Sequence, residues 1–475
     1  MKKNFIKYPI FLAVVGLIVL AFLGTYLVKR TVLTMNKPTE NLAGSAVKPN
    51  VIIVDICSLR ADHLSGNGYA RPTTPNLDAF ANGAASFDNF WTESGWCLPN
   101  FATMLTGTRP EIHHKVFVGN TSPLPQQLTT LAEIFNKNGF KTAGFSGSRY
   151  LVSGAYGLER GFETLQDAFK PEDDAMGAAS FEENLPEVRT WLSSHKDNPF
   201  FLYVTIDDLH SPYSRSDNPK LFDPAYHGIL DTVSADIAFS RVYNGENLTI
   251  DPKVRSAVVE FKKDPRHLKN LVARYDAALV HVDGLLGKLF DELKKNGLWD
   301  KSIIIVTAHQ GELFGEHALL GHARGIYEPI LHVPFLIHYP GITSSGSHFS
   351  QLTERIDIPA TILDVMGLLP QYKEQYTGTS LLPILQNPDA SWKNYIFASN
   401  KPIRPLPLGE GPKIEERAVR NDRYKLIWYG YNSEPYELYD LKNDPEEKNN
   451  LVHQLPDVFA ELKSQLDAYV GQYAQ

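Results

Sequence analysis

Residues 51–64 read VIIVDICSLRADHL, and this stretch decides the class of fold. Val51–Ile56 is a short apolar run rich in β-branched residues, which is typical of a buried strand. Similar runs recur later at Phe200–Ile206, Ile303–Thr307 and Pro334–His338. Segments with helical spacing of apolar residues lie between these runs, most clearly from Leu271 to Leu293. Strands that alternate with helices predict an α/β fold with a large, mostly parallel sheet flanked by helices.

The last part of the chain has a different character. Residues 420–429 and 436–441 read as strands, and a helix is expected over 455–470. We therefore predict a main domain over 49–385 and a small C-terminal α+β antiparallel domain over 386–475. Residues 214–269 break the alternation of strands and helices in the main domain and are interpreted as a surface insertion.

The N-terminal segment predicts a membrane anchor. Residues 9–28 carry no charge, and at about 1.5 Å per residue they reach across a hydrocarbon core of about 30 Å. We predict a cytoplasmic tail over 1–8, one transmembrane helix over 9–29 and a polar linker over 30–48. The flanking basic residues favour an N-inside, single-pass orientation, with the body on the periplasmic or extracellular side. A cleaved signal peptide is the alternative.

Composition narrows the class of protein. The chain has 475 residues, of which 43% are hydrophobic, and this fits an ordered globular protein. Its net charge of −8 argues against a nucleic-acid partner, which would favour a basic face.

Seven motifs occur in a fixed order along the chain. Two of them surround the only two cysteines, Cys57 in VDICSLRADHL and Cys97 in WCLPNFATMLTG. The others are GYARPTTPNLD (68–78), DLHSPY (208–213), RYDA (274–277), FGEH followed by GH (314–322), and the closing YELYDL…DPE…NL (436–451). Together they resemble the motifs of the sulfatase family, and the resemblance runs from about Asn50 to Val470.

The resemblance implies the fold, the reaction and the site residues. The implied fold is alkaline-phosphatase-like, and the implied reaction is hydrolysis of a sulfuric ester on a sulfated small molecule or glycan. In this family a cysteine is oxidised to formylglycine, and a divalent cation, usually calcium, polarises the sulfate. The implied catalytic positions are Cys97, His210, His322 and Arg60, and the implied metal positions are Asp55, Cys57, His309 and Gln310.

Several of these positions depart from the family pattern. Phe101 stands where the Cys-x-Pro-x-Arg recognition sequence for formylglycine formation has Arg. Cys57 stands in the place of the first metal-binding Asp, with Asp55 two residues earlier on the same face of the strand. His309 and Gln310 replace the later Asp and its His or Asn neighbour. Neutral ligands of this kind would hold calcium weakly.

Three functions are compatible with this pattern. The first is a membrane-anchored sulfatase that uses formylglycine at position 97. The second is an inactive homologue in which Cys57 and Cys97 form a disulfide, which would stabilise the fold by about 4 kcal/mol in the chain-entropy model. The third is a hydrolase or structural site in which Cys57, Cys97 and His309 hold a softer metal such as zinc.

Overall fold

A computed structural model of the chain describes residues 48–115, 122–167, 180–246, 250–401, 415–430 and 434–473. Residues Pro49–Gln475 form one compact unit. The predicted tail, transmembrane helix and linker over 1–47 lie outside the described residues. Within the described ranges, no helix is long and apolar enough to cross a membrane.

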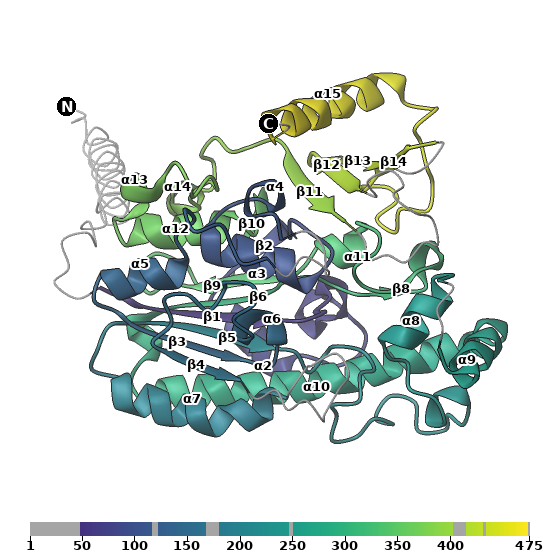
Figure 1. Cartoon of the computed structure of the whole chain (residues 1–475), viewed down its shortest axis with the longest axis horizontal. Coiled ribbons are helices and arrows are strands. Elements are labelled where there is room, and N and C mark those ends of the chain that lie inside the picture. The colour runs from purple at the N-terminus through teal and green to yellow at the C-terminus, as the bar shows by residue number, and fades with distance from the viewer. Residues whose placement is uncertain are drawn as a thin grey trace, which may run out of the picture. The chain divides into compact units, whose positions relative to one another are not determined.

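An eight-stranded sheet forms the centre of this unit (Figure 1). The strands follow the order β10-β2-β9-β6-β1-β5-β3-β4. Their bounds are β1 Asn50–Ile56, β2 Ala85–Trp91, β3 Lys141–Ser146, β4 Thr164–Asp167, β5 Phe200–Ile206, β6 Ser302–Ala308, β9 Phe335–His338 and β10 Ser347–Glu354. Only β9 runs antiparallel to its two neighbours, so the prediction of a mostly parallel sheet is confirmed.

Helices cover both faces of this sheet. Helices α2, α7 and α10 lie on one face, and α3, α5 and α12 lie on the other (Figure 1). The α-helices described before the C-terminal sheet are α2 Pro75–Ala81, α3 Cys97–Thr106, α4 Pro110–His113, α5 Leu131–Lys137, α6 Arg149–Val152, α7 Phe181–His195, α8 Ile237–Tyr243, α9 Pro252–Lys263, α10 Pro265–Lys295, α11 Glu328–Leu331, α12 Asp357–Val365, α13 Leu369–Tyr372 and α14 Leu382–Gln386. Helix α10 is the predicted amphipathic helix, and its apolar stripe is buried.

The C-terminal part forms a second sheet, with the antiparallel order β11-β12-β13-β14. Its strands are β11 Ile396–Asn400, β12 Glu416–Arg420, β13 Tyr424–Tyr429 and β14 Tyr436–Asp440, and α15 Pro456–Tyr473 packs on it. The predicted continuous strand over 420–429 is wrong in one respect. Asn421–Arg423 form the turn between β12 and β13, because the Asn421 side chain accepts from the Arg423 and Tyr424 amides at 3.0 and 2.6 Å.

The register of the central strands decides where the site lies. In β1, Asp55 is paired with Thr205 of β5 and Thr307 of β6, and Ile56 is paired with Ile206 and Ala308. The three parallel strands therefore end at the same level. In open α/β sheets ligands bind at this carboxyl edge.

Helix α3 ends at Gly107, and this glycine is required on two counts. Its φ of 62° is in the left-handed region, and an added Cβ would lie 2.1 Å from the Tyr376 ring. We expect Gly107→Ala to lower the free energy of unfolding by about 2 kcal/mol or more, from backbone strain and overpacking together. Chemical denaturation measures this loss.

Gly139→Ala is the matched control. Gly139 also has a positive φ, 81°, but an added Cβ would meet no atom within 4 Å. In this variant the free energy of unfolding should fall only by the backbone contribution, about 1 kcal/mol. Equal losses in the two variants would contradict the role of the Tyr376 contact.

Candidate active site

Three side chains follow the coterminal strands β1, β5 and β6. Cys57 follows β1 and its amide donates to the Ile206 carbonyl at 2.8 Å. Asp207 follows β5, and His309 follows β6, where its amide donates to the Ile56 carbonyl at 3.3 Å. These side chains are buried. The carboxyl edge of the sheet therefore places a thiol, a carboxyl and an imidazole at adjacent positions.

Cys97 reaches the same place from the first residue of α3. The Asn100 side-chain amide donates to the carbonyls of Ser94, Trp96 and His309, and so ties the start of α3 to the end of β6. As a result, ligand atoms of Cys57, Cys97 and His309 all lie within 4.8 Å of one another. The Gln310 amide donates to the Cys57 sulfur at 3.3 Å and to the Cys97 sulfur at 3.6 Å.

The predicted disulfide between these two cysteines is not formed in the structure. Both Cys57 and Cys97 are free and buried, and each sulfur accepts a hydrogen bond from the Gln310 amide. The side-chain hydrogen bond from Cys57 lowers the pKa of Cys97 well below its usual range, against the effect of burial, and His309 and His322 lower it further. Burial raises the pKa of Cys57. Cys97 is therefore the thiol that ionises first.

His309 is held by a carboxylate behind it. Its Nδ1 donates to Asp55 Oδ1 at 3.2 Å. Its Nε2 is buried and meets no partner in hydrogen-bonding geometry among the described residues. Burial lowers the pKa of His309, but Asp55 and the Cys97 thiolate outweigh this and raise it to about 9.

Asp55 was predicted as a metal ligand, and the structure places it behind His309. Both of its oxygens accept hydrogen bonds from the buried Arg355 guanidinium, and Oδ2 also accepts from the Tyr203 hydroxyl at 2.5 Å. Burial raises the pKa of Asp55, but Arg355 and His309 outweigh this and lower it. Asp55 is thus an ionised group that positions His309 and is already paired.

His322 and His210 form a second pair of imidazoles near Cys97. His322 Nδ1 lies 3.1 Å from Glu312 Oε1 and 3.4 Å from the Ser58 hydroxyl. Burial lowers the pKa of His322, but Glu312 and Cys97 outweigh it and raise the pKa to about 10. Burial and the neighbouring His322 lower the pKa of His210. The pair thus offers one charged and one neutral imidazole, with ring centres 5.1 Å apart.

The charge on His322 predicts a pH-dependent stability. Its folded-state pKa of about 10 lies above the ordinary 6.5, so its stabilising contribution is complete below pH 6.5 and is lost as the pH rises to about 10. We expect the unfolding midpoint to fall over this interval. His322→Gln should fall less steeply, and equal slopes for the two proteins would contradict the ion pair with Glu312.

Arg60, the fourth predicted catalytic residue, is engaged elsewhere. Its guanidinium donates to both oxygens of Asp62 at 2.9 and 2.7 Å and to Glu316 at 2.7 Å. It also donates to the Glu312 carbonyl at 3.0 Å and lies over the Phe314 ring. Arg60 therefore supports the segment that carries Glu312.

Several residues of this centre escaped the sequence reasoning. Arg355 and Tyr203 lie outside every quoted motif, and only the fold brings them to Asp55. Asp207 precedes the DLHSPY motif. Burial, together with the Cys97 charge, raises the pKa of Asp207 to about 7, and its Oδ2 accepts from the Thr205 hydroxyl at 2.9 Å. Glu312 lies two residues after Gln310 and was given no role, although its contact with His322 gives it one.

The residues present do not fit a calcium ion. Calcium takes six to eight oxygen ligands, chiefly carboxylates. Here Asp55 is paired with Arg355, and Asp207 does not belong to the group whose ligand atoms lie within 4.8 Å. The atoms that converge are two thiols and an imidazole, which match softer metals.

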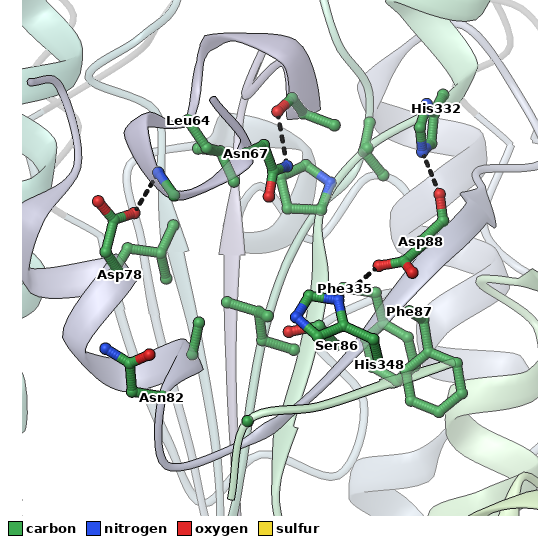
Figure 2. Close-up of a pocket in the computed structure, with 18 residues that line it drawn as sticks. Leu64, Asn67, Asp78, Asn82, Ser86, Phe87, Asp88, His332, Phe335 and His348 are labelled. Carbon is green, nitrogen blue, oxygen red and sulfur yellow. Dashed lines mark hydrogen bonds and ion pairs between the residues drawn. The ribbon is translucent and has the colours of Figure 1, made fainter. Parts of the chain in front are cut away.

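A cavity of about 600 Å³ lies away from these residues, beside α2, β2 and β9 (Figure 2). His348 Nδ1 lies 2.9 Å from Asp88 Oδ1, and His332 Nε2 lies 2.8 Å from the Asp88 carbonyl, as Figure 2 shows. None of the predicted site residues lines this cavity. The reactive groups of the described chain therefore gather at the strand ends and not here.

Comparison with known proteins agrees with this geometry. The sulfatase family model matches residues 49–368, and that for the C-terminal region of N-sulphoglucosamine sulphohydrolase matches residues 315–472. The chain is 26% identical to an ulvan-active sulfatase of Formosa agariphila over 435 residues, covering 89% of this chain and 80% of that one. It is 26% identical to human arylsulfatase K over 464 residues, covering 91% and 84%.

Solved structures share the fold. A protein in complex with its substrate D-glucosamine-2-N,6-O-disulfate superposes with a TM-score of 0.70 at 22% identity, covering 90% of this chain and 98% of that one. A phosphonate monoester hydrolase of Agrobacterium radiobacter superposes with a TM-score of 0.71 at 22% identity, covering 90% and 96%. With the family model matched over most of the chain and the motifs gathered at the strand ends, the chain belongs to the sulfatase family.

Proposed function

We propose that the chain hydrolyses sulfuric esters, with position 97 as the nucleophile. The observation that carries this proposal is the place of Cys97. It is the first residue of α3, at the carboxyl edge of the sheet, between His309 and His322. A helix N-terminus favours a developing negative charge, as do two neighbouring imidazoles. Cys97 is also the position that the family resemblance assigns to formylglycine.

The proposed reaction proceeds by displacement at sulfur. A hydroxyl of the hydrated aldehyde at position 97 releases its proton to water and attacks the sulfur, and the bond between sulfur and the sugar oxygen breaks. Glu312 raises the pKa of His322 against the effect of burial, and the protonated imidazole donates a proton to the departing oxygen. The remaining hydroxyl of the sulfated hydrate then loses its proton, the carbon–oxygen bond to sulfate breaks, and the aldehyde returns and is hydrated again by water.

A specific observation favours a second candidate, a zinc centre. Buried His309 Nε2 and Gln310 Oε1 have no hydrogen-bond partner among the described residues, and buried polar atoms are normally paired. Zinc takes thiolate and imidazole ligands in a tetrahedron at about 2.0–2.3 Å. Cys57, Cys97 and His309 supply three ligands, and Asp55 behind His309 is the usual carboxylate support of a zinc-bound imidazole. Two thiolates would also neutralise Zn²⁺ in this buried site.

One preparation distinguishes the two candidates. Mass spectrometry of the Cys97 peptide, run without reductant, and zinc analysis are applied to the same purified full-length protein. An aldehyde at Cys97 together with hydrolysis of an aryl sulfate supports the first candidate. An intact thiol with one zinc per chain supports the second. A protein with an intact thiol, no zinc and no hydrolysis would contradict both.

We also propose a sulfated sugar as the substrate class. The ulvan-active relative and the glucosamine-disulfate complex support it, because ulvan and the glucosamine disulfate are both sulfated saccharides. A panel of sulfated oligosaccharides, with released sulfate as the readout, tests this class. Release of sulfate from aryl sulfates alone would contradict it.

The body of the protein is proposed to act outside the cytoplasm. The uncharged segment over 9–28, preceded by Lys2, Lys3 and Lys7, supports this orientation. Protease treatment of intact cells and of opened spheroplasts tests it. A body that stays protected in spheroplasts and is degraded only after lysis would contradict the proposed side.

A further inference from the structure

A small cavity of about 60 Å³ opens beside His322. It lies between α8, which belongs to the predicted surface insertion, and the segment that follows β8 (Leu320–Gly321). Its polar lining includes Ser211, Ser240, Asn244 and two arginines, Arg241 and Arg324. His322 lines this cavity and its side chain also interacts with Cys97, so the cavity is joined to the proposed site by this imidazole.

The two arginines are held by one buried carboxylate. Arg241 Nε lies 2.8 Å from Glu246 Oε2, and Arg324 Nη2 lies 2.9 Å from Glu246 Oε1. The Glu246 side chain is only 3% exposed, whereas those of Arg241 and Arg324 are 30% and 24% exposed. Each guanidinium has five N–H donors and gives one to Glu246, and no other described carboxylate pairs with either arginine. The remaining donors of both groups therefore have no carboxylate partner among the described residues.

The charged side chains that line this cavity carry a net positive charge. Two guanidinium groups face one carboxylate, so the three side chains carry a net charge of +1. The other nearby acids are already paired, Glu312 with His322 and Glu316 with Arg60. Planar guanidinium groups bind carboxylates and sulfates with paired hydrogen bonds.

The neighbouring backbone is also fixed. The Asn244 side chain accepts from the Leu320 amide at 2.8 Å and donates to the Leu320 carbonyl at 3.0 Å. This pair of bonds joins α8 to the segment that carries Gly321 and His322. The cavity wall and the imidazole beside Cys97 therefore keep one relative position, which a specificity pocket requires.

We propose that Arg241 and Arg324 bind a second sulfate group of the substrate, on the sugar that carries the hydrolysed ester or on the adjoining one. The inference rests on the proposed function, because it names a substrate feature for the same site. Glu246 is a positioning residue that orients the two guanidinium groups toward the cavity.

The test compares two substrates that differ by one anionic group. The kcat/KM for a disulfated saccharide is divided by that for its monosulfated counterpart, in the full-length protein and in Arg324→Gln and Arg241→Gln. We expect this ratio to fall by about 10- to 100-fold in each variant, as for the loss of charge-assisted hydrogen bonds. Arg324→Lys, which keeps the charge without the planar fork, should recover part of the ratio.

Arg266→Gln is the matched control. Arg266 lies in the same insertion and pairs with a carboxylate, Asp264, at 2.6 Å, but it does not line the cavity. Its ratio should equal that of the wild type. An unchanged ratio in folded Arg324→Gln and Arg241→Gln would overturn the inference. Calorimetric binding of the disulfated saccharide separates the two proposals: binding that depends on Arg324 without any hydrolysis would contradict the proposed function alone.

Discussion

Cys97→Ala is expected to lower kcat/KM for an aryl sulfate by about 10³-fold or more, because it removes the atom that attacks sulfur. The fold should survive the change. Cys97 loses only a sulfur atom, and the start of α3 stays tied to the end of β6 through Asn100. Initial rates at several substrate concentrations, with the unfolding midpoint of the same preparation, measure both effects.

Cys57→Ala is the matched comparison for this prediction. Cys57 is buried in the same cluster and also accepts from Gln310, so the packing change is similar, but it is not at the nucleophile's position. If formylglycine forms at Cys97, Cys57→Ala should retain more activity than Cys97→Ala. If zinc is the reactive group, each variant should lose zinc and activity together. Full activity in Cys97→Ala would remove position 97 from the mechanism.

The strand pattern predicted much of the architecture because its signal is local. The runs at Val51–Ile56 and Phe200–Ile206 are apolar throughout, and buried parallel strands need this composition. The structure has β1 and β5 there almost residue for residue. The direction of β9 was not predictable, because a four-residue apolar strand reads the same in a parallel and in an antiparallel pair.

The site was predicted only as far as the motifs reach. Cys57, Cys97, His309 and Gln310 were named from motif positions, and the structure brings all four together. The role of Asp55 was not foreseen, because it depends on Arg355, which lies 300 residues away in the chain. Pairings of this kind depend on tertiary packing and cannot be deduced from the spacing of residues in the sequence.

Arg355→Met is expected to destabilise the protein by about 3–5 kcal/mol, because it leaves the Asp55 carboxylate buried without its partner. Both residues are fully buried. The Arg355 guanidinium also donates to the Asn100 carbonyl at 2.9 Å and to the Ala308 carbonyl at 3.2 Å, so the ends of α3 and β6 lose a shared donor. The midpoint of guanidinium chloride unfolding at neutral pH measures the loss.

A double variant separates the destabilisation caused by the unpaired Asp55 carboxylate from that caused by the lost packing of Arg355. The double variant Asp55→Asn/Arg355→Met removes both charges, so it should recover part of the stability lost in Arg355→Met. Arg423→Met is the matched exposed control. Its ion pair with Asp440 spans 2.7 Å, but the Arg423 side chain is 44% exposed, so we expect a loss of less than about 1 kcal/mol.

Arg355→Met should also lose stability less steeply than the wild type as the pH falls, because without the guanidinium the pKa of Asp55 in the folded state is no longer held below that of the unfolded chain. A loss no larger than that of Arg423→Met would mean that Arg355 does not neutralise Asp55, and Asp55 would then be available again as a metal ligand.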